Sequence, residues 1–377
     1  MHPGSVGWGA EVLLESAWRL ISADDFRNPE AARNALRQIA SWWEEACRSA
    51  GISEPMPDVP GWAETLQRVL REAPLREAVL SAVESFIRNS RATFDPFQLF
   101  ERSPRALEVL GRLACGSPFL TQTLLADPQC LASLTLHGRT ADTKDREQFI
   151  AEAEQCLRGA SGRVGRLREL RRYQRRQLLR IGMCDAFGLM DLRFVTLQLS
   201  LLADAMVQCS LTLAAAECGV SAEQISVIAL GKLGGEELNY SSDIDLVLIC
   251  SEQTAQTQRL ARLLVDGLTD NTPPGFLYRV DLRLRPWGEA GPLVSAPQAY
   301  ADYLAQHAEL WEKQAMLKAR PIAGSAALGT GFLQQIRPLL FTASEARVLA
   351  DVQAMKAKIE HRLRQRGKLY SEVKLGV

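Results

Sequence analysis

The chain has 377 residues, of which 47% are hydrophobic and 23% are charged, which is ordinary for a soluble globular protein of about two or three structural units. Its 44 basic and 44 acidic residues give a formal net charge of zero, so overall charge favours neither a nucleic acid nor an anionic membrane as a partner. The N-terminus lacks the apolar core of a signal peptide, and no apolar run approaches the length of a membrane span. We therefore expect a cytoplasmic protein with no nucleic-acid and no membrane partner.

The cysteine pattern also favours a cytoplasmic protein. The eight cysteines are scattered and form no C-x-x-C pair, and the four histidines lie far from them in sequence. Zinc-binding motifs need closer spacing than this. We therefore expect reduced thiols, as in a cytoplasm, rather than disulfides or a structural zinc site.

Residues 1–220 are predicted to form a helical region, because nearly every turn signal there marks the start or the end of a helix. Asn28 is a typical N-cap residue, and Pro29 follows it in the first helical turn, where a missing N–H costs nothing. The residue pairs at 103–104 and 127–128 repeat this arrangement. Apolar residues then recur at helical spacing, and convincing strand patterns are absent.

A basic stretch closes this helical region. Arginines recur along one predicted helix, among them Arg163, Arg166, Arg171, Arg172, Arg175, Arg176 and Arg180. They could form a solvated face, or some of them could bind an acidic partner or a phosphate. Tyr173 is the one aromatic residue among them, so a surface for stacking nucleic-acid bases is not favoured.

Near residue 223 the pattern changes from helical to strand-like. "ISVIALG" (225–231) and "SDIDLVLIC" (242–250) are short apolar segments that predict strands. Helical spacing returns at 254–270, and "GFLYRVDLRLRP" (275–286) predicts a third strand. Helix is expected again over 296–319. Strands and helices in this order indicate a compact α/β unit with flanking helices.

Two of these strands carry carboxylates on a polar face. Side chains alternate between the faces of a strand, so Asp243 and Asp245 share one face, about 7 Å apart. On the third strand, Asp281 is expected to share a face with Arg279, Arg283 and Arg285. Carboxylates this close repel one another unless a cation neutralises them. A hard cation with oxygen ligands, Mg²⁺ or Mn²⁺, meets that need, and the arginines could neutralise phosphate oxygens.

A glycine-rich turn precedes the D-x-D pair and contains Gly231, Lys232, Gly234 and Gly235. Glycine permits a tight turn and lets a phosphate approach backbone N–H groups, and the lysine adds positive charge. This is not a P-loop, because the closing G-K-[ST] is missing. For the glycines alone, a tight turn with surface ion pairs is an equal alternative. The turn together with D-x-D and the later aspartate favours a metal-dependent phosphate site.

Three blocks of sequence resemble a known family: "ALGKLGGEELNYSSDIDLVLI", "YRVDLRLRPWGEAGPLVS" and "LWEKQAMLKARPIAG". The glycines, D-x-D and later aspartate resemble nucleotidyltransferases of the DNA polymerase β type. In this order, the blocks resemble glutamine synthetase adenylyltransferase/deadenylylase, and the stretch "LRELRRYQRRQLLRIG" is similar to that family too. The resemblance covers most of the chain from about residue 100 onward.

The resemblance implies an α+β fold in three parts. A largely helical region (1–220) precedes a polymerase β-like nucleotidyltransferase domain (221–340), which is a small mixed sheet with flanking helices. Residues 341–377 are expected to form a C-terminal helix that starts a truncated continuation. The family would continue beyond the final "VKLGV" into a second nucleotidyltransferase unit, so we expect a fragment or a truncated gene product.

The resemblance also implies roles for individual residues. Those expected to hold Mg²⁺ or Mn²⁺ and carry catalysis are Asp243, Asp245 and Asp281. Those expected to line the nucleotide and phosphate pocket are Gly231, Lys232, Gly234, Gly235, Ser242, Arg283, Arg285, Lys318 and Arg320. For Lys318 and Arg320, a solvated helix end is the alternative. Trp311 and Glu312 are interpreted as packing and a buried pair, with a supporting role near the site as the alternative.

The reaction is implied as well. "ELNYSSDID" and "AMLKARPIAG" are similar to the N-terminal half of the family, which removes AMP from a tyrosine of glutamine synthetase and so regulates nitrogen assimilation. The resemblance implies that inorganic phosphate attacks the adenylyl phosphorus, which gives ADP and unmodified tyrosine. Expected partners are glutamine synthetase, an adenine nucleotide, inorganic phosphate and a PII-type signalling protein.

Two alternatives to this reaction stay open. The same type of site could transfer AMP from ATP to the tyrosine, since one site catalyses both directions of a reaction. The chain could instead be a catalytically idle module that docks glutamine synthetase or a signalling protein. The intact aspartates argue against an idle module.

Overall fold

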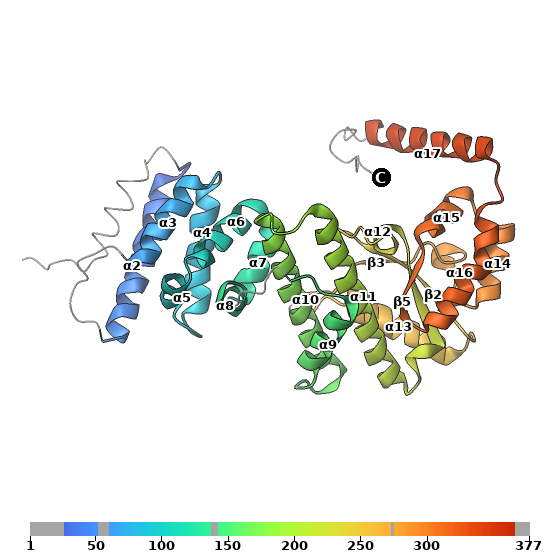
Figure 1. The fold of residues 1–377 in the computed structure, drawn as a ribbon, viewed down its shortest axis with the longest axis horizontal. Helices are drawn as coiled ribbons and strands as arrows, with labels where there is room; N and C mark the ends of the chain where they lie inside the picture. The colour runs from blue at the N-terminus through green and yellow to red at the C-terminus, as the bar shows by residue number, and fades with distance from the viewer. Residues whose placement is uncertain (1–25, 52–59, 137–141, 273–274, 366–377) are drawn as a thin grey trace, which may run out of the picture. The chain divides into compact units, whose positions relative to one another are not determined.

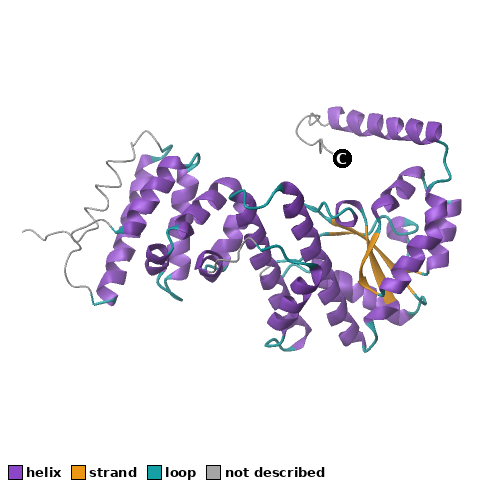
Figure 2. Cartoon of the chain, viewed as in Figure 1, coloured by secondary structure: helices purple, strands orange, loops and turns teal. Residues whose placement is uncertain are grey.

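The computed structural model describes residues 26–51, 60–136, 142–272 and 275–365 of the chain. These residues are mostly helical and include a small sheet (Figures 1 and 2), so the predicted α+β class is confirmed. The chain divides into two compact units. Unit 1 comprises the described residues within 1–143 and 175–195, and unit 2 those within 144–174 and 196–377. The domain boundaries expected at residues 220 and 340 stay predictions.

The described residues of unit 1 form helices and the turns between them. The helices are α2 (Pro29–Ser49), α3 (Gly61–Glu72), α4 (Arg76–Ser90), α5 (Pro96–Arg102), α6 (Arg105–Gly116), α7 (Pro118–Ala126) and α8 (Gln129–Leu136). As predicted, Asn28 caps α2: its side chain accepts a hydrogen bond from the Ala31 N–H at 3.1 Å. The cap predicted at Ser103 is wrong, because α6 begins after Pro104 and no side chain caps it.

The helices that lie wholly or mostly in unit 2 follow in chain order. They are α9 (Arg146–Leu157), α10 (Gly162–Ala186, shared with unit 1), α11 (Leu192–Cys218), α12 (Gly231–Gly234), α13 (Ala255–Thr269), α14 (Pro297–Gln306), α15 (Leu310–Ala315), α16 (Ala326–Leu340) and α17 (Glu345–Gln365). The strands are β1 (Ile225–Ala229), β2 (Ile244–Cys250), β3 (Val280–Asp281), β4 (Val294–Ser295) and β5 (Arg320–Gly324).

The sheet is mixed, as predicted. Its strand order is β3-β2-β1-β5, and β4 also pairs with β2. β1 runs antiparallel to β2 and β5, whereas β3 and β4 run parallel to β2. Apolar side chains of β1 and β2, such as Ile228 and Val247, pack against Tyr300 of α14 and Phe332 of α16. These two helices lie on one side of the sheet in Figure 1.

The third predicted strand is much shorter than expected. Within 275–286 only Val280 and Asp281 are strand, and the following residues form turns. The Asp281 carboxylate accepts a hydrogen bond from the Arg283 backbone N–H at 2.9 Å, a local bond that starts a turn. Arg283 and Arg285 therefore do not lie on a continuing strand face.

The helix predicted over 296–319 is interrupted. α14 ends at Gln306, and a capping box between Glu309 and Glu312 starts the separate helix α15. β5, which we did not predict, then begins at Arg320. Its Pro321 is tolerated because, among the described strands, β5 pairs with β1 alone and so lies at the edge of the sheet.

α11 is long and apolar enough to span a membrane by length and composition, which we did not expect from the sequence. However, 78% of its most apolar window is buried inside the protein. That burial is typical of the core helix of a folded protein. All eight cysteines lie in the described residues, and none forms a disulfide.

Some arginines of the arginine-rich stretch neither form a solvated face nor await an external acidic partner. They bind other groups inside the protein, a role that we did not predict. Arg171 is buried and donates hydrogen bonds to the Asp270 carbonyl at 3.0 Å and the Thr272 hydroxyl at 2.8 Å. Arg180 is also buried and donates to the Asp142 carbonyl at 2.8 Å. For these arginines a solvated face is wrong, because they satisfy backbone carbonyls inside their own units.

Candidate functional site

The site is a cleft at the junction of β2 and β3. β2 is buried except at Asp245, which is half-buried. In the parallel pairing of these strands Asp245 and Asp281 are register partners, so their side chains lie on the same face. Both line a cleft of about 390 Å³ together with Gly231, Arg283, Leu284, Trp311 and Ala315. The parallel pairing of β2 with β3 thus brings two of the three predicted aspartates together in the cleft.

Asp243, the third predicted aspartate, lies outside this lining. Its carboxylate is exposed and accepts a hydrogen bond from Arg279 Nε at 2.5 Å. Arg279 also donates to the Ser241 carbonyl at 2.6 Å, which holds the pair in the loop before β2. Among the residues that the structure describes, no group of three or more His, Cys, Asp or Glu side chains is arranged to hold a metal ion.

The donor set of the cleft suits a hard cation. Asp245 and Asp281 carry carboxylates on neighbouring strands, and Mg²⁺ and Mn²⁺ prefer such ligands, but a cation would have to share the Asp281 oxygens with Arg283. Asp243 comes two residues before Asp245 and would need to leave Arg279 to join them.

Arg283 binds the Asp281 carboxylate closely. Its Nε lies 3.0 and 2.9 Å from the two carboxylate oxygens, and its Nη2 lies 2.5 Å from Oδ2. These bonds hold the pKa of Asp281 below its ordinary value, and the carboxylate raises the pKa of Arg283. Asp281 is therefore charged at neutral pH, and the exposed guanidinium places a positive charge beside the carboxylates.

Arg285, predicted to bind phosphate, holds a turn in this structure. It donates to the backbone carbonyls of Leu282, Glu289 and Gly291 at 2.9, 3.2 and 3.3 Å. The cleft lining does not include it. This contact set stabilises the segment after β3, where Trp287 has a positive φ of 65°.

The glycine-rich turn packs closely against Asp245 of β2 and against Lys318, which comes just before β5. Gly231 has a φ of +55°, and a Cβ atom there would collide with Oδ2 of Asp245. At Gly234 a Cβ would collide with the backbone carbonyls of Lys318 and Ala229. Gly235 lies against the aliphatic part of the Lys318 side chain. Gly234 is therefore required by its close approach to backbone, Gly231 is favoured by its positive φ, and the Lys318 side chain beside Gly235 could move aside.

Lys232 and Ser242 do not line the cleft. Ser242 donates its hydroxyl to Asn239 Oδ1 at 2.6 Å, within the loop that joins the turn to β2. Lys318 forms an exposed ion pair with Glu237 at 2.8 Å. Of the predicted pocket residues, the cleft gathers Gly231 and Arg283 beside Asp245 and Asp281.

Gly231→Ala is expected to reduce activity through Asp245, because the added Cβ would displace its carboxylate. Gly219→Ala is the matched control: Gly219 has a φ of +65° but open space around it. Each substitution places an alanine in left-handed backbone at a cost of roughly 1–2 kcal/mol. Both variants should therefore unfold at lower urea concentration than the wild type, but only Gly231→Ala should lose turnover. Equal turnover in the two variants would contradict this role of Gly231.

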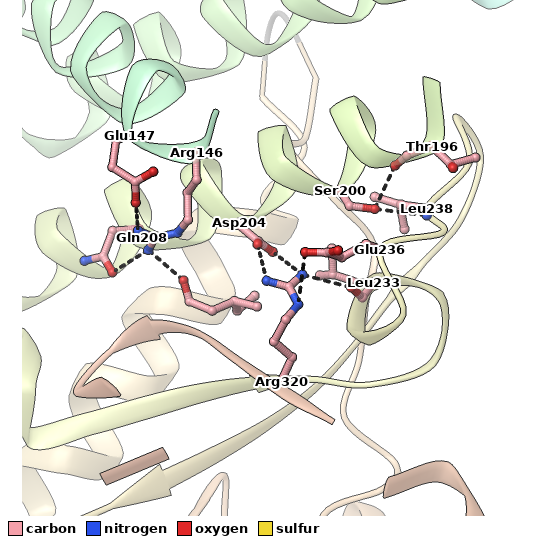
Figure 3. Close-up of polar contacts among 11 residues, drawn as sticks. Arg146, Glu147, Thr196, Ser200, Asp204, Gln208, Leu233, Glu236, Leu238 and Arg320 are labelled. Atoms are coloured by element: carbon pink, nitrogen blue, oxygen red, sulfur yellow. Dashed lines mark hydrogen bonds and ion pairs between the residues drawn. The ribbon is translucent and has the colours of Figure 1, made fainter. Parts of the chain in front are cut away.

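Arg320 joins three elements through a buried ion pair (Figure 3). Asp204 of α11 is fully buried, and its two carboxylate oxygens accept from Arg320 at 2.5 and 3.2 Å. Arg320 also donates to the Leu233 carbonyl in the glycine-rich turn at 3.0 Å. Glu236, whose φ of 58° is also positive, lies 3.8 Å from Arg320 Nε. Arg320 is therefore not a solvated helix end: it fixes the glycine-rich turn to α11 and β5.

Burial raises the pKa of Asp204 to about 6, although Arg320 opposes that shift. We missed this residue in the sequence. The available signal was a carboxylate in the middle of a long apolar helix, because a buried charge needs a partner. Ser200, one turn earlier on α11, accepts from the Leu238 N–H at 3.1 Å, so α11 also holds the loop after the glycine-rich turn (Figure 3).

Trp311 and Glu312 have different environments. Glu312 is buried and accepts hydrogen bonds from the Tyr303 hydroxyl at 2.7 Å and from the Glu309 N–H at 2.8 Å, as expected for a buried pair. Trp311 is 45% exposed and lines the cleft. The interpretation of Trp311 as a packing residue is therefore wrong.

One comparison with known proteins bears on this site. A family model described as glutamate-ammonia ligase adenylyltransferase matches residues 107–335, which is more than half of the chain. Enzymes of that family are nucleotidyltransferases that act on glutamine synthetase, the other name of glutamate-ammonia ligase. The match includes the glycine-rich turn, all three predicted aspartates and Arg320.

Proposed function

The chain belongs to the glutamate-ammonia ligase adenylyltransferase family, and from that premise we propose that it removes AMP from an adenylyl-tyrosine of glutamine synthetase by phosphorolysis. The observation that carries this proposal is the meeting of Asp245, Asp281 and Arg283 in one cleft. Carboxylates suit a divalent cation, and an arginine beside them suits phosphate oxygens. The direction is supported by the similarity of "ELNYSSDID" and "AMLKARPIAG" to the deadenylylating half of the family.

Asp245 and Asp281 are proposed to hold Mg²⁺ or Mn²⁺, with Asp243 as a third ligand once it leaves Arg279. The bound cation would neutralise charge on the reacting phosphates. Arg283 is exposed on the cleft side of Asp281, where it can bind the oxygens of the incoming phosphate. Lys232, Ser242, Arg285 and Lys318 stay proposed nucleotide or phosphate contacts, each requiring a change of its present partners or place.

The proposed reaction breaks one P–O bond and forms another. An oxygen of monohydrogen phosphate attacks the adenylyl phosphorus, and the bond from that phosphorus to the tyrosine oxygen breaks. The leaving tyrosine oxygen takes the proton that the phosphate brought, so the products are ADP and unmodified tyrosine. Among the described residues no histidine lines the cleft, which fits a nucleophile that needs cations more than it needs a general base.

The proposal includes a cytoplasmic location, where the scattered cysteines stay reduced. Its partners are glutamine synthetase as protein substrate, an adenine nucleotide, inorganic phosphate and a PII-type signalling protein. The last of these rests on the sequence resemblance alone.

Product identity tests phosphorolysis. Adenylylated glutamine synthetase is incubated with the chain and Mg²⁺, with and without inorganic phosphate, and the released nucleotides are separated. We expect ADP, and only in the tube that contains phosphate. AMP formed at the same rate in both tubes would show hydrolysis instead. A third tube with unmodified glutamine synthetase and labelled ATP detects the opposite direction, because label would then appear on the protein.

A further inference from the structure

The cleft between β2, β3 and α15 has a charged and an apolar set of lining side chains. Asp245, Asp281 and Arg283 form the charged set, and Leu284, Trp311 and Ala315 form the apolar set. A nucleotide is divided in the same way, into phosphates and a planar aromatic base. The charged set is accounted for by the proposed function, whereas the apolar set is not.

Helix α15 holds Trp311 in this lining. Trp311 and Ala315 are four residues apart and so lie on one face of the helix. The neighbouring Glu312 fixes the rotation of the helix, because it is buried and bonded to Tyr303 and to the Glu309 N–H. Ala315, the other residue of α15 in the lining, has a small side chain. Trp311 is thus a large apolar side chain kept exposed at the cleft by a buried contact next to it.

Of the other described tryptophans, three have aromatic neighbours, and the ring of the fourth, Trp42, lies under the guanidinium of Arg91. Trp43 and Trp62 are buried and lie 6.3 Å apart between ring centroids. Trp287 is exposed, but its ring packs on Tyr303 at 5.1 Å and on His307 at 4.7 Å, and it does not line the cleft. For Trp311, a planar ligand in the cleft would be such a neighbour.

We propose that Trp311 is the residue on which the purine base of the nucleotide stacks. This proposal rests on the proposed function, since it assigns the base of the same nucleotide whose phosphates the charged set would bind. Stacking of a base on an aromatic side chain is tolerant of the base but lost with the ring. Trp311 would thus add affinity for a nucleoside diphosphate that a diphosphate without a base does not gain.

The test is equilibrium binding of ADP and of inorganic pyrophosphate, measured by calorimetry in Mg²⁺ without any turnover. We expect Trp311→Ala to weaken ADP binding roughly ten-fold or more and to leave pyrophosphate binding unchanged. Trp311→Phe should retain most of the ADP affinity because it keeps an aromatic ring. Trp287→Ala is the matched control, an exposed tryptophan of the same unit outside the cleft, and should bind both ligands as the wild type does.

Asp281→Asn separates this proposal from the proposed function. It should weaken the binding of both ligands, since it alters the charged set. If Asp281→Asn weakens both while Trp311→Ala binds ADP as tightly as the wild type, stacking is overturned and the proposed function stands. An equal loss of ADP and pyrophosphate in Trp311→Ala would also overturn stacking. If Asp281→Asn changes neither affinity, the cleft does not bind phosphates and both proposals fail.

Discussion

Asp245→Asn is expected to lower the rate of the proposed AMP removal roughly 10²-fold or more. Asp245 is the half-buried residue of an otherwise buried strand, and it faces Asp281 in the cleft. Asparagine keeps the shape of the side chain but removes the negative charge that would hold a divalent cation. Because Asp245 adds little to core packing, the free energy of unfolding should change by less than about 1 kcal/mol. Initial rates of ADP release at saturating Mg²⁺ and urea unfolding measure the two effects.

Asp302→Asn is a suitable control for this variant. Asp302 is exposed on α14, far in sequence from the cleft residues of β2 and β3, and its carboxylate accepts a hydrogen bond from Gln298 at 2.8 Å. It should retain the wild-type rate. A comparable loss in Asp243→Asn would support the proposed third ligand. Near wild-type turnover of Asp245→Asn would contradict the metal-binding role of this aspartate.

Arg320→Ala is expected to destabilise unit 2 by about 3–5 kcal/mol, because it leaves the fully buried Asp204 without its partner. The Leu233 carbonyl also loses one of its donors, so the glycine-rich turn is held less firmly to Arg320 and α11. Urea unfolding of the wild type and of the variant measures the difference. Replacing both partners by apolar residues, as in Asp204→Leu with Arg320→Met, should restore much of the lost stability, since neither charge then stays buried alone. A double variant no more stable than Arg320→Ala would contradict this explanation.

Because Arg320 affects the pKa of Asp204, the loss of stability caused by Arg320→Ala should depend on pH. The pKa of Asp204 is raised from 3.8 to about 6 on folding, so the wild type loses stability from this group as the pH rises from about 4 to 6. Above pH 6 the carboxylate is ionised in both states, and the loss stops. Without Arg320, which lowers this pKa, the folded carboxylate stays protonated to higher pH and the loss continues. The stability gap between variant and wild type should therefore widen above about pH 6.

Local signals in the sequence were sufficient for several parts of the fold. β1 and β2 were predicted from short apolar segments bounded by polar turns, and α13 from its helical spacing. Alternation along each strand predicted that Asp245 and Asp281 both lie on the polar face of their strands. These features depend on residues close together in the chain, so the sequence determined them by itself.

Only the tertiary structure decided the surroundings of the cleft. Asp204 and Arg320 lie 116 residues apart in sequence, and no local pattern shows that they meet. β3 stops where the Asp281 side chain binds the backbone of Arg283, which alternation alone does not predict. Trp311 is exposed because Glu312, its neighbour, is buried against Tyr303. Periodicity tells which side chains share a face of one element, but the packing of elements distant in sequence decides which face meets the core and which meets a ligand.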